Sequence, residues 1–419
     1  MHKWLDWAIR RKSGGWYMIF DLPELPEGWA YETLESCSKN GSITYGIVQP
    51  GAQVSQGVPI IRVNNFRDMH LDLSDVMHVQ PEIAAKYERT KLHGGEVLLT
   101  IVGTVGQVAV VSKQLAGFNV ARAVAVIHPL PKVSADWIAL CLRSPLSRHL
   151  LVSRANTTVQ TTINLKDLRA LPIPVPPEAE REEITALIGA LDDRIALLRE
   201  TNATLEAIAQ ALFKSWFVDF DPVYAKQQGI APAGMDDATA ALFPDGFEES
   251  ALGEVPRGWN IQKLESFIGL AYGKALKSTD RINGDVPVYG SGGITGFHNT
   301  ALVKGPSVIV GRKGTVGSLY WEDRPFFPID TVFYLRPMKP LTYCYYLLQT
   351  LGLESMNTDA AVPGLNRNNV YRLLMPVAAD PVLDAFDQIV APLRAAIFRN
   401  SEQAQTLATL RDTLLPRLI

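Results

Sequence analysis

The stretch EREEITALIGALDDRIALLRETNATLEAIAQALFKSWF (Glu180 to Phe217) has the clearest fold signature in the chain. It contains no proline, and its single glycine is Gly189. Apolar residues recur every three or four positions, at Ile184, Ile188, Leu191, Ile195, Leu198, Leu205, Ala209, Leu212 and Trp216. This spacing over five heptads is typical of a coiled-coil seam. The stretch therefore predicts one long helix, which at ~1.5 Å per residue is roughly 57 Å long.

A second stretch with the same spacing ends the chain. Its seam residues are Phe386, Val390, Leu393, Ile397, Ala404, Leu407, Leu414 and Leu418. One asparagine interrupts each seam, Asn202 in the first and Asn400 in the second. A seam asparagine can fix helix register at a cost in stability. If the helices pair antiparallel, the two asparagines fall near each other and are hypothesised to meet; the alternative is that each faces solvent.

The two helices belong to an internal repeat about half the chain long. Three pairs of segments show it: LPELPEGW (Leu22 to Trp29) with LGEVPRGW (Leu252 to Trp259), GTVG at Gly103 with GTVG at Gly314, and INLKDLRALPIPV (Ile163 to Val175) with LNRNNVYRLLMPV (Leu365 to Val377). The offset falls from 230 to 211 to 202 and then holds to the end of the chain. Each copy therefore has a module of variable length, as loops tolerate, followed by one of fixed length, as a helix register requires.

The variable modules mix strands and short helices, which predicts an α/β (mixed α+β) fold for each. In the first module, strands are expected at 58–63, 96–103, 107–111 and 123–129, and a helix at 136–144. In the second, strands are expected at 286–290, 307–311, 317–321 and 331–337, and a helix at 342–350. Each GTVG piece separates two strands, so it is interpreted as a turn that uses the freedom of glycine. A phosphate-binding role is the alternative.

Charge is unevenly distributed over a chain whose formal net charge is −3. Residues 1–177 carry +4, 178–251 carry −10, 252–378 carry +4 and 379–419 carry −1. Only the two basic blocks suit DNA phosphates, although ordinary charge scatter is the alternative. The acidic first helix should face away from DNA, and its exposed face is either a protein-binding surface or simply solvated.

Several other classes of protein are disfavoured. The three cysteines, Cys37, Cys141 and Cys344, lie far apart without CxxC or Cys/His spacing, which favours neither disulfides nor zinc and fits a cytoplasmic location. No apolar run reaches 18 residues, so no membrane span is expected. The N-terminal 20 residues are interpreted as a short helix or an arm rather than a signal peptide.

Catalytic motifs are also missing from the sequence. GSGGITG (Gly290 to Gly296) has Thr295 where a dinucleotide-binding loop needs glycine, and PDGFEES (Pro244 to Ser250) has Ser250 where a nuclease motif needs lysine. There is no P-loop, methyltransferase, HExxH or GxSxG motif. The chain is therefore expected to bind without catalysis, with no catalytic residue and no metal.

DNA-reading side chains are expected among polar and basic residues on loops of the two modules. The candidates are Tyr45, Gln49, Arg62, Asn64, Asn65, Arg122, Arg154, Asn156, Thr157 and Gln160 in the first module, and Lys274, Lys277, Tyr289, Ser291, Arg312, Lys313 and Asn357 in the second. Any one of them is otherwise a solvated surface residue.

Together these segments resemble the DNA-specificity subunits of type I restriction–modification systems. The resemblance runs from about Leu22 to Ile419. The most specific segments are ITYGIVQPG (Ile43 to Gly51), GVPIIRVNNF (Gly57 to Phe66), NLKDLRALPIPVPP (Asn164 to Pro177), LFKSWFVDFDPV (Leu212 to Val223) and AVPGLNRNNVYRLLMPV (Ala361 to Val377), beside the paired PEGW and PRGW openings.

The resemblance implies two target-recognition domains that read the halves of a split, asymmetric site in double-stranded DNA, separated by two long antiparallel helices that set the gap. It also implies docking of two methyltransferase subunits, which bind S-adenosylmethionine, and of restriction subunits, which use ATP and magnesium. No cofactor is expected in this chain. A free-standing DNA-binding regulator and a scaffold that does not touch DNA are the alternatives.

The expected organisation has six parts. They are an N-terminal extension (1–21), a first target-recognition domain (22–177), a central helix (178–219), a linker (220–251), a second target-recognition domain (252–378) and a C-terminal helix (379–419).

Overall fold

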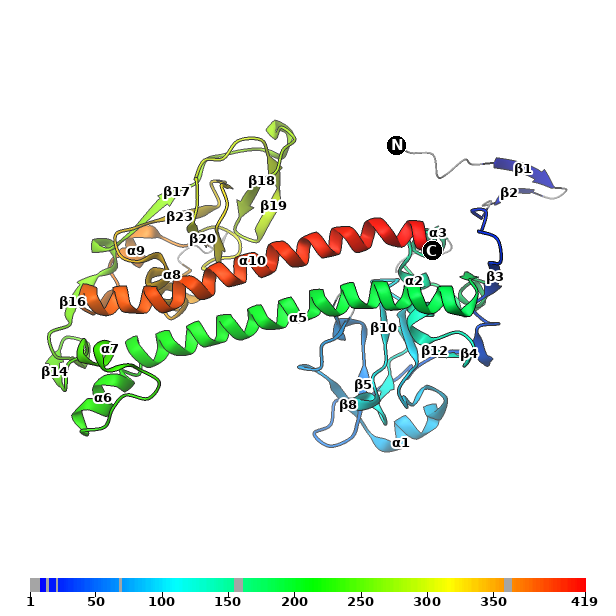
Figure 1. Ribbon diagram of the computed structural model, residues 1–419, viewed down its shortest axis with the longest axis horizontal. Helices are drawn as coiled ribbons and strands as arrows, with labels where there is room; N and C mark the ends of the chain where they lie inside the picture. The colour runs from blue at the N-terminus through cyan, green and yellow to red at the C-terminus, as the bar shows by residue number, and fades with distance from the viewer. Residues whose placement is uncertain (1–7, 13–14, 20–21, 68–69, 154–160, 358–363) are drawn as a thin grey trace. The chain divides into compact units, whose positions relative to one another are not determined.

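The computed structural model describes residues 8–12, 15–19, 22–67, 70–153, 161–357 and 364–419. It divides into two compact units, called here the first unit (residues up to 194, with 406–419) and the second unit (195–405). Two long helices contribute to both units: α5 (Glu178–Phe217) and α10 (Asp380–Leu418), green and orange to red in Figure 1. Their bounds agree with the helices predicted from the heptad spacing.

The first unit is built around an antiparallel four-stranded sheet. Its strands, in order across the sheet, are β10 (Val108–Val110), β9 (Val97–Thr100), β12 (Val124–Pro129) and β4 (Ser38–Tyr45). A smaller sheet has the order β11 (Asn119–Val120), β5 (Val58–Ile61) and β8 (Met77–Val79). A strand pair consists of β13 (Pro172–Val175) and β3 (Ala30–Thr33). The helices are α1 (Pro81–Ala84), α2 (Ala135–Arg143), α3 (Pro145–Ser153) and α4 (Leu165–Arg169).

The second unit repeats this plan strand for strand. Its main sheet has the order β17 (Ile268–Tyr272), β23 (Val332–Pro337), β20 (Ser307–Gly311) and β21 (Leu319–Glu322). Its smaller sheet has the order β19 (Gly293–His298), β18 (Val286–Gly290) and β22 (Phe327–Pro328), and its strand pair is β16 (Asn260–Lys263) with β24 (Leu374–Val377). Its helices include α8 (Leu341–Gln349) and α9 (Arg367–Tyr371). The predicted internal repeat and mixed α/β fold are confirmed.

The GTVG segments are turns between paired strands, as predicted. They join β9 to β10 in the first unit and β20 to β21 in the second, and both strand pairs are antiparallel. All four glycines have positive φ, from 75° at Gly317 to 92° at Gly106. Gly317 is also needed for space, because a Cβ there would lie 2.4 Å from the backbone nitrogen of Glu354.

Each unit packs its own apolar core against its segment of the helix pair. In the first unit, Ile184 and Ile188 of α5 and Leu415 of α10 are buried with Trp137 of α2. In the second unit, Phe213 and Trp216 of α5 pack on Phe386 of α10, with ring centroids 5.8 and 6.0 Å apart. The seam positions are therefore used both between the helices and under the sheet domains.

Partly buried ion pairs join the helices within each unit. In the first unit, Asp192 of α5 binds Arg411 of α10 at 2.9 Å and Arg143 of α2 at 3.2 Å. In the second unit, Arg394 of α10 binds Glu206 of α5 at 2.6 Å. Asp192 and Arg394 occupy matching places in the repeat, 202 residues apart, with opposite charges. The acid is therefore on α5 and the base on α10 in both pairs.

Two segments differ from the sequence-based expectation. Residues 8–19, interpreted as a short helix or an arm, form the antiparallel strands β1 (Ala8–Lys12) and β2 (Gly15–Ile19); the glycines at 14 and 15 disfavour a helix. Residues 220–251, predicted as a linker, contain α6 (Asp221–Gln227), α7 (Asp237–Ala241) and β14 (Phe247–Ser250), which pairs with β15 (Gly253–Pro256). Val223 and Phe243 are buried in the core of the second unit.

Candidate nucleic-acid interface

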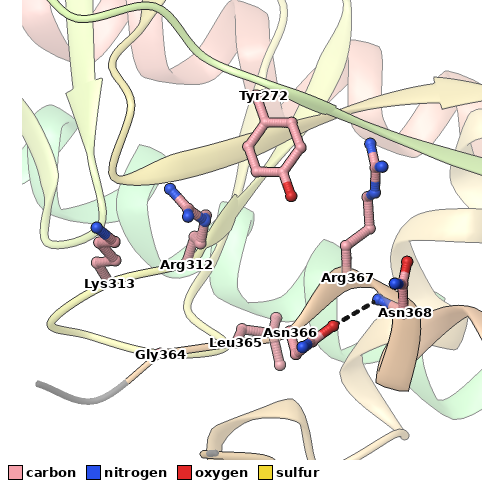
Figure 2. A pocket seen from close by; sticks show the side chains of 8 residues that line it. All are labelled: Tyr272, Arg312, Lys313, Gly364, Leu365, Asn366, Arg367 and Asn368. Atoms are coloured by element: carbon pink, nitrogen blue, oxygen red, sulfur yellow. Dashed lines mark hydrogen bonds between the residues drawn. The ribbon is translucent and has the colours of Figure 1, made fainter. Parts of the chain in front are cut away.

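A basic pocket of about 270 Å³ opens in the second unit, at the edge of the main sheet (Figure 2). It is lined by Tyr272, Arg312, Lys313, Gly364, Leu365, Asn366, Arg367 and Asn368. These residues come from the end of β17, from the turn after β20, and from the segment that opens α9. Segments about 95 residues apart in the sequence therefore meet in one hollow.

Backbone hydrogen bonds hold the walls of this pocket together. The amide nitrogen of Leu365 donates to the carbonyl oxygen of Arg312 at 2.8 Å, and Lys313 bridges to Gly364. The amide nitrogens of Arg312 and Lys313 both donate to the carbonyl oxygen of Thr331, at 2.9 and 3.1 Å. The two basic residues consequently leave from a fixed backbone rather than from a free loop.

Two arginines in the pocket share one aromatic ring. The guanidinium carbon of Arg312 lies 5.0 Å from the centroid of the Tyr272 ring, and that of Arg367 lies 4.9 Å from it. In Figure 2 the ring lies between the two guanidinium groups. Tyr272 packs in turn on the buried ring of Phe333, 4.9 Å away. Cation–π contacts of this kind fix the guanidinium planes and leave their edge N–H groups available for hydrogen bonds.

The first unit has the same backbone at the matching place but different side chains. Val102 bridges to Thr162, and the amide nitrogen of Ile163 donates to the carbonyl oxygen of Ile101 at 3.0 Å. These contacts match those of Lys313 with Gly364 and of Leu365 with Arg312, shifted by the repeat offsets. The residues matching the three cations of the second unit are therefore Ile101, Val102 and Leu165.

The first unit has a pocket of about 390 Å³ beside this position. Its lining includes Tyr45, Tyr87, Lys86, Arg89 and Leu165. Tyr45 pairs with Ala125 of β12 just as Tyr272 pairs with Phe333 of β23, so the two tyrosines are matching residues. Both are 47% exposed. Each unit thus presents an exposed tyrosine at the end of an equivalent strand, with different charged neighbours.

Most predicted residues of the first unit lie at its surface. Gln49, Asn64 and Arg122 are exposed. Arg62 is half-buried and forms an ion pair with Asp75 at 3.3 Å. Asn65 is the exception: it is buried, and its amide group donates to the carbonyl oxygens of Asp72 and Asp75 at 3.0 and 2.9 Å. We therefore withdraw Asn65 as a base-reading candidate. Four further candidates, Arg154, Asn156, Thr157 and Gln160, lie outside the described residues.

In the second unit, Lys274, Lys277, Lys313 and Asn357 are exposed, and Arg312 and Ser291 are half-buried. Asn357 accepts a hydrogen bond from the amide nitrogen of Gly364 at 2.8 Å, next to the pocket. Tyr289 is buried, and its hydroxyl donates to Oε2 of Glu322 at 2.8 Å. Burial and this bond raise the pKa of Tyr289. Tyr289 is therefore a core residue, and we withdraw it from the candidates.

Sequence reasoning missed Tyr272 and Arg367, two of the side chains that shape the pocket. Arg367 stands in the segment LNRNNVYRLLMPV, which was used only to recognise the repeat. Its alignment with Leu165 was the available signal, because a charge that replaces a leucine on a shared framework must face a different environment. The seam residues Asn202 and Asn400 lie together on α5 and α10 in the second unit.

Two searches of the described residues were negative. No group of three or more His, Cys, Asp or Glu side chains is arranged there to hold a metal ion. Among those same residues, no helix has the length and apolar character that crossing a membrane requires.

Comparison with known proteins gives a consistent set of matches. The family model for the type I restriction modification DNA specificity domain matches residues 45–207 and 256–370, more than half of the chain. The EcoBI type I restriction enzyme specificity subunit of Escherichia coli is 31% identical over 198 residues, which is 45% of this chain and 42% of that subunit. The HindI specificity subunit of Haemophilus influenzae is 25% identical over 85% of this chain and 92% of its own length.

A solved structure shares the fold. The type I restriction–modification S subunit from M. genitalium superposes with a TM-score of 0.60 at 18% sequence identity, over 95% of this chain and 98% of that one. At this identity the likeness speaks for the fold alone.

Proposed function

This chain belongs to the type I restriction modification DNA specificity family, and from that premise we propose that it selects the split DNA sequence on which a restriction–modification complex acts. Members of this family are DNA-recognition subunits without catalysis of their own, and they assemble with other subunits of the system and with DNA. In this proposal each unit reads one half of an asymmetric site, and α5 and α10 set the gap between the halves.

One observation carries the proposal. The two units share strand order and backbone hydrogen bonds around their pockets, yet they differ in charge at matching positions. Phosphate and sugar are alike along DNA, so a duplicated fold with different side chains suits two different base sequences. A reader of a symmetric site would instead carry the same side chains twice.

We propose two methyltransferase subunits as partners, because the helix pair has two matching exposed apolar positions. Leu187 and Ile208 on α5 are 49% exposed, and Ile389 and Leu410, which match them at the offset of 202, are 42% and 46% exposed. A doubled apolar surface suits two copies of one partner. We place S-adenosylmethionine on the methyltransferase subunits and ATP with magnesium on restriction subunits, with no cofactor in this chain and with the complex in the cytoplasm.

The test is the pattern of adenine methylation in the genome of a host that otherwise lacks it. The chain is expressed with and without the methyltransferase subunit of its own system. We expect a motif of two short specific runs around a fixed gap, only when both are present. If the methyltransferase is active and no split motif is found, the proposal is wrong. Specific DNA binding by the chain alone, without directed methylation, would favour a regulator.

A further inference from the structure

The arginine pair of the second unit has a directional geometry. Arg312 and Arg367 flank the exposed ring of Tyr272, at 5.0 and 4.9 Å. Arg312 spends one N–H on the carbonyl oxygen of Asp330 at 3.0 Å, and Arg367 makes one long bond, 3.4 Å, to the carbonyl oxygen of Leu270. A guanidinium has five N–H donors, so donors remain on both side chains.

The ring limits how these donors can turn. A flexible cation on the surface meets a ligand from any side, whereas a guanidinium stacked on a ring keeps its plane and presents its edge. Tyr272 is itself fixed, since it packs on Phe333 and belongs to β17. Fixed edge donors in a hollow suit a planar partner with two adjacent acceptors. In the major groove that partner is guanine, through O6 and N7.

The comparison between units separates a base contact from a phosphate contact. A phosphate contact would serve both half-sites equally, because phosphates carry no sequence information. At the positions of Arg312 and Arg367 the first unit has Ile101 and Leu165 on the same hydrogen-bonded backbone. The arginine pair is thus a feature of one unit only, as a reader of one half-site should be.

We infer that Arg312 and Arg367, held on Tyr272, read guanine in the half-site of the second unit, and that this contact distinguishes the two half-sites. The inference rests on the proposed function and adds to it the residues and the base. Lys313 lies at the same turn but is exposed, and none of the ring contacts found in the described residues fixes it, so we assign it no base.

The experiment determines the methylation motif directed by R312K and by R367K, expressed in cells with the methyltransferase subunit. Lysine keeps the positive charge and loses the stacked fork. We expect one half-site of the wild-type motif to contain guanine, and preference for that guanine to fall roughly 5- to 150-fold in each variant, the range for loss of one bidentate base contact. The other half-site should stay unchanged.

Two further variants serve as controls. Tyr272→Phe keeps the ring and should keep the motif, whereas Tyr272→Ala should relax it at the same guanine. Arg257→Lys changes an exposed arginine of the same unit, paired with Asp245, and should leave the motif unchanged. Thermal unfolding of each variant checks that the fold is intact, and a relaxed motif in a stable Tyr272→Ala protein supports the inference even if one arginine variant unfolds.

Three results would overturn the inference. The first is a wild-type motif without guanine in either half-site. The second is an unchanged motif with uniformly weaker methylation in the lysine variants, which would mark a phosphate contact. The third is a change in both half-sites. A wild-type chain that directs no split motif at all would instead remove the proposed function, and this inference with it.

Discussion

Asn400 donates a hydrogen bond from Nδ2 to Oδ1 of Asn202, at 2.9 Å, inside the helix pair of the second unit. Asn202 in turn donates from Nδ2 to the carbonyl oxygen of Ile397 at 3.1 Å and to Oγ of Ser401 at 3.0 Å. The side-chain amide of Asn202 is therefore satisfied on both its oxygen and its nitrogen. A slip of α5 along α10 would separate all three contacts, so this pair is well placed to define the register.

Replacing only one of these asparagines should destabilise the chain. In Asn202→Leu the amide of Asn400 loses its partner in a half-buried seam, and we expect a loss of about 1 kcal/mol in unfolding free energy. In the double variant N202L/N400L both polar groups are gone, so the midpoint of thermal unfolding should recover or rise. Sedimentation should then reveal additional oligomeric states, because the polar register mark is missing. A double variant that is less stable than either single one would contradict this account.

The Arg394–Glu206 pair predicts a second, larger effect on stability. The Arg394 guanidinium is 4.6 Å from the ring centroid of Trp321, and Glu206 also accepts a hydrogen bond from the Tyr346 hydroxyl at 3.2 Å. Arg394→Met would leave Glu206 partly buried without its cation. We expect a cost of about 2 kcal/mol, below the ~3–5 kcal/mol seen for fully buried pairs, because the Glu206 side chain keeps 25% exposure.

A double-mutant cycle measures that coupling. Denaturant unfolding of R394M, E206L and R394M/E206L should show the double variant to be more stable than R394M, since no unpaired charge remains. Arg324→Gln is the matched control, because Arg324 and Glu402 are half-exposed partners in the same unit and their contact should contribute little. Strictly additive effects in the Arg394–Glu206 cycle would contradict the prediction.

The long helices, the main strands and the GTVG turns were predictable because their signals are local. Heptad spacing in α5 and apolar runs such as Ser307–Gly311 depend on neighbours within a few residues. The pocket was only half predictable. Arg312 is conspicuous in the sequence, but its contact with Tyr272 and Arg367 depends on how β20, β17 and α9 converge.

Burial of polar side chains was the main source of error. Tyr289 and Asn65 have the chemistry of DNA readers, yet one donates to Glu322 in the core and the other caps a short 3₁₀ turn at Val63–Asn65. Neither use leaves a sequence signal, because the partners are fixed by tertiary packing. The segment 220–251 was misjudged for a related reason: its scattered Val223 and Phe243 become core residues only when Trp216 is placed beside them.

The cysteines give a prediction about pH and reactivity. Burial, with a smaller contribution from Glu32, raises the pKa of Cys37 to about 11, and burial raises the pKa of Cys344 to about 12 and that of Cys141 well above its usual value. The thiolate is the reactive form, so the native chain should resist iodoacetamide at pH 8, whereas the chain unfolded in guanidinium should be labelled at all three cysteines.

The same shifts determine a direction for stability. Because the folded state favours the neutral thiols, their contribution is complete below the unfolded pKa of about 8.5. It declines as the pH rises toward about 11, the pKa of folded Cys37. Rapid mass-shift labelling of the native chain at pH 8, or a stability that rises between pH 9 and 11 in a Cys37-dependent way, would contradict these assignments.

The helix pair predicts how the gap between half-sites can be changed. Removing one heptad from each helix, residues 194–200 of α5 and 402–408 of α10, leaves the Asp192–Arg411 and Asn202–Asn400 contacts facing each other. Seven residues rise ~10 Å and turn the helix to within about 20° of two full turns, so the seam stays in phase. We expect the methylation motif to keep both half-sites and to lose up to about three base pairs from the gap, at ~3.4 Å per base pair. The same deletion in α5 alone would put Asn202 out of register with Asn400, and that variant should be unstable. A paired deletion that leaves the gap unchanged, or that alters either half-site, would show that the helices do not set the spacing.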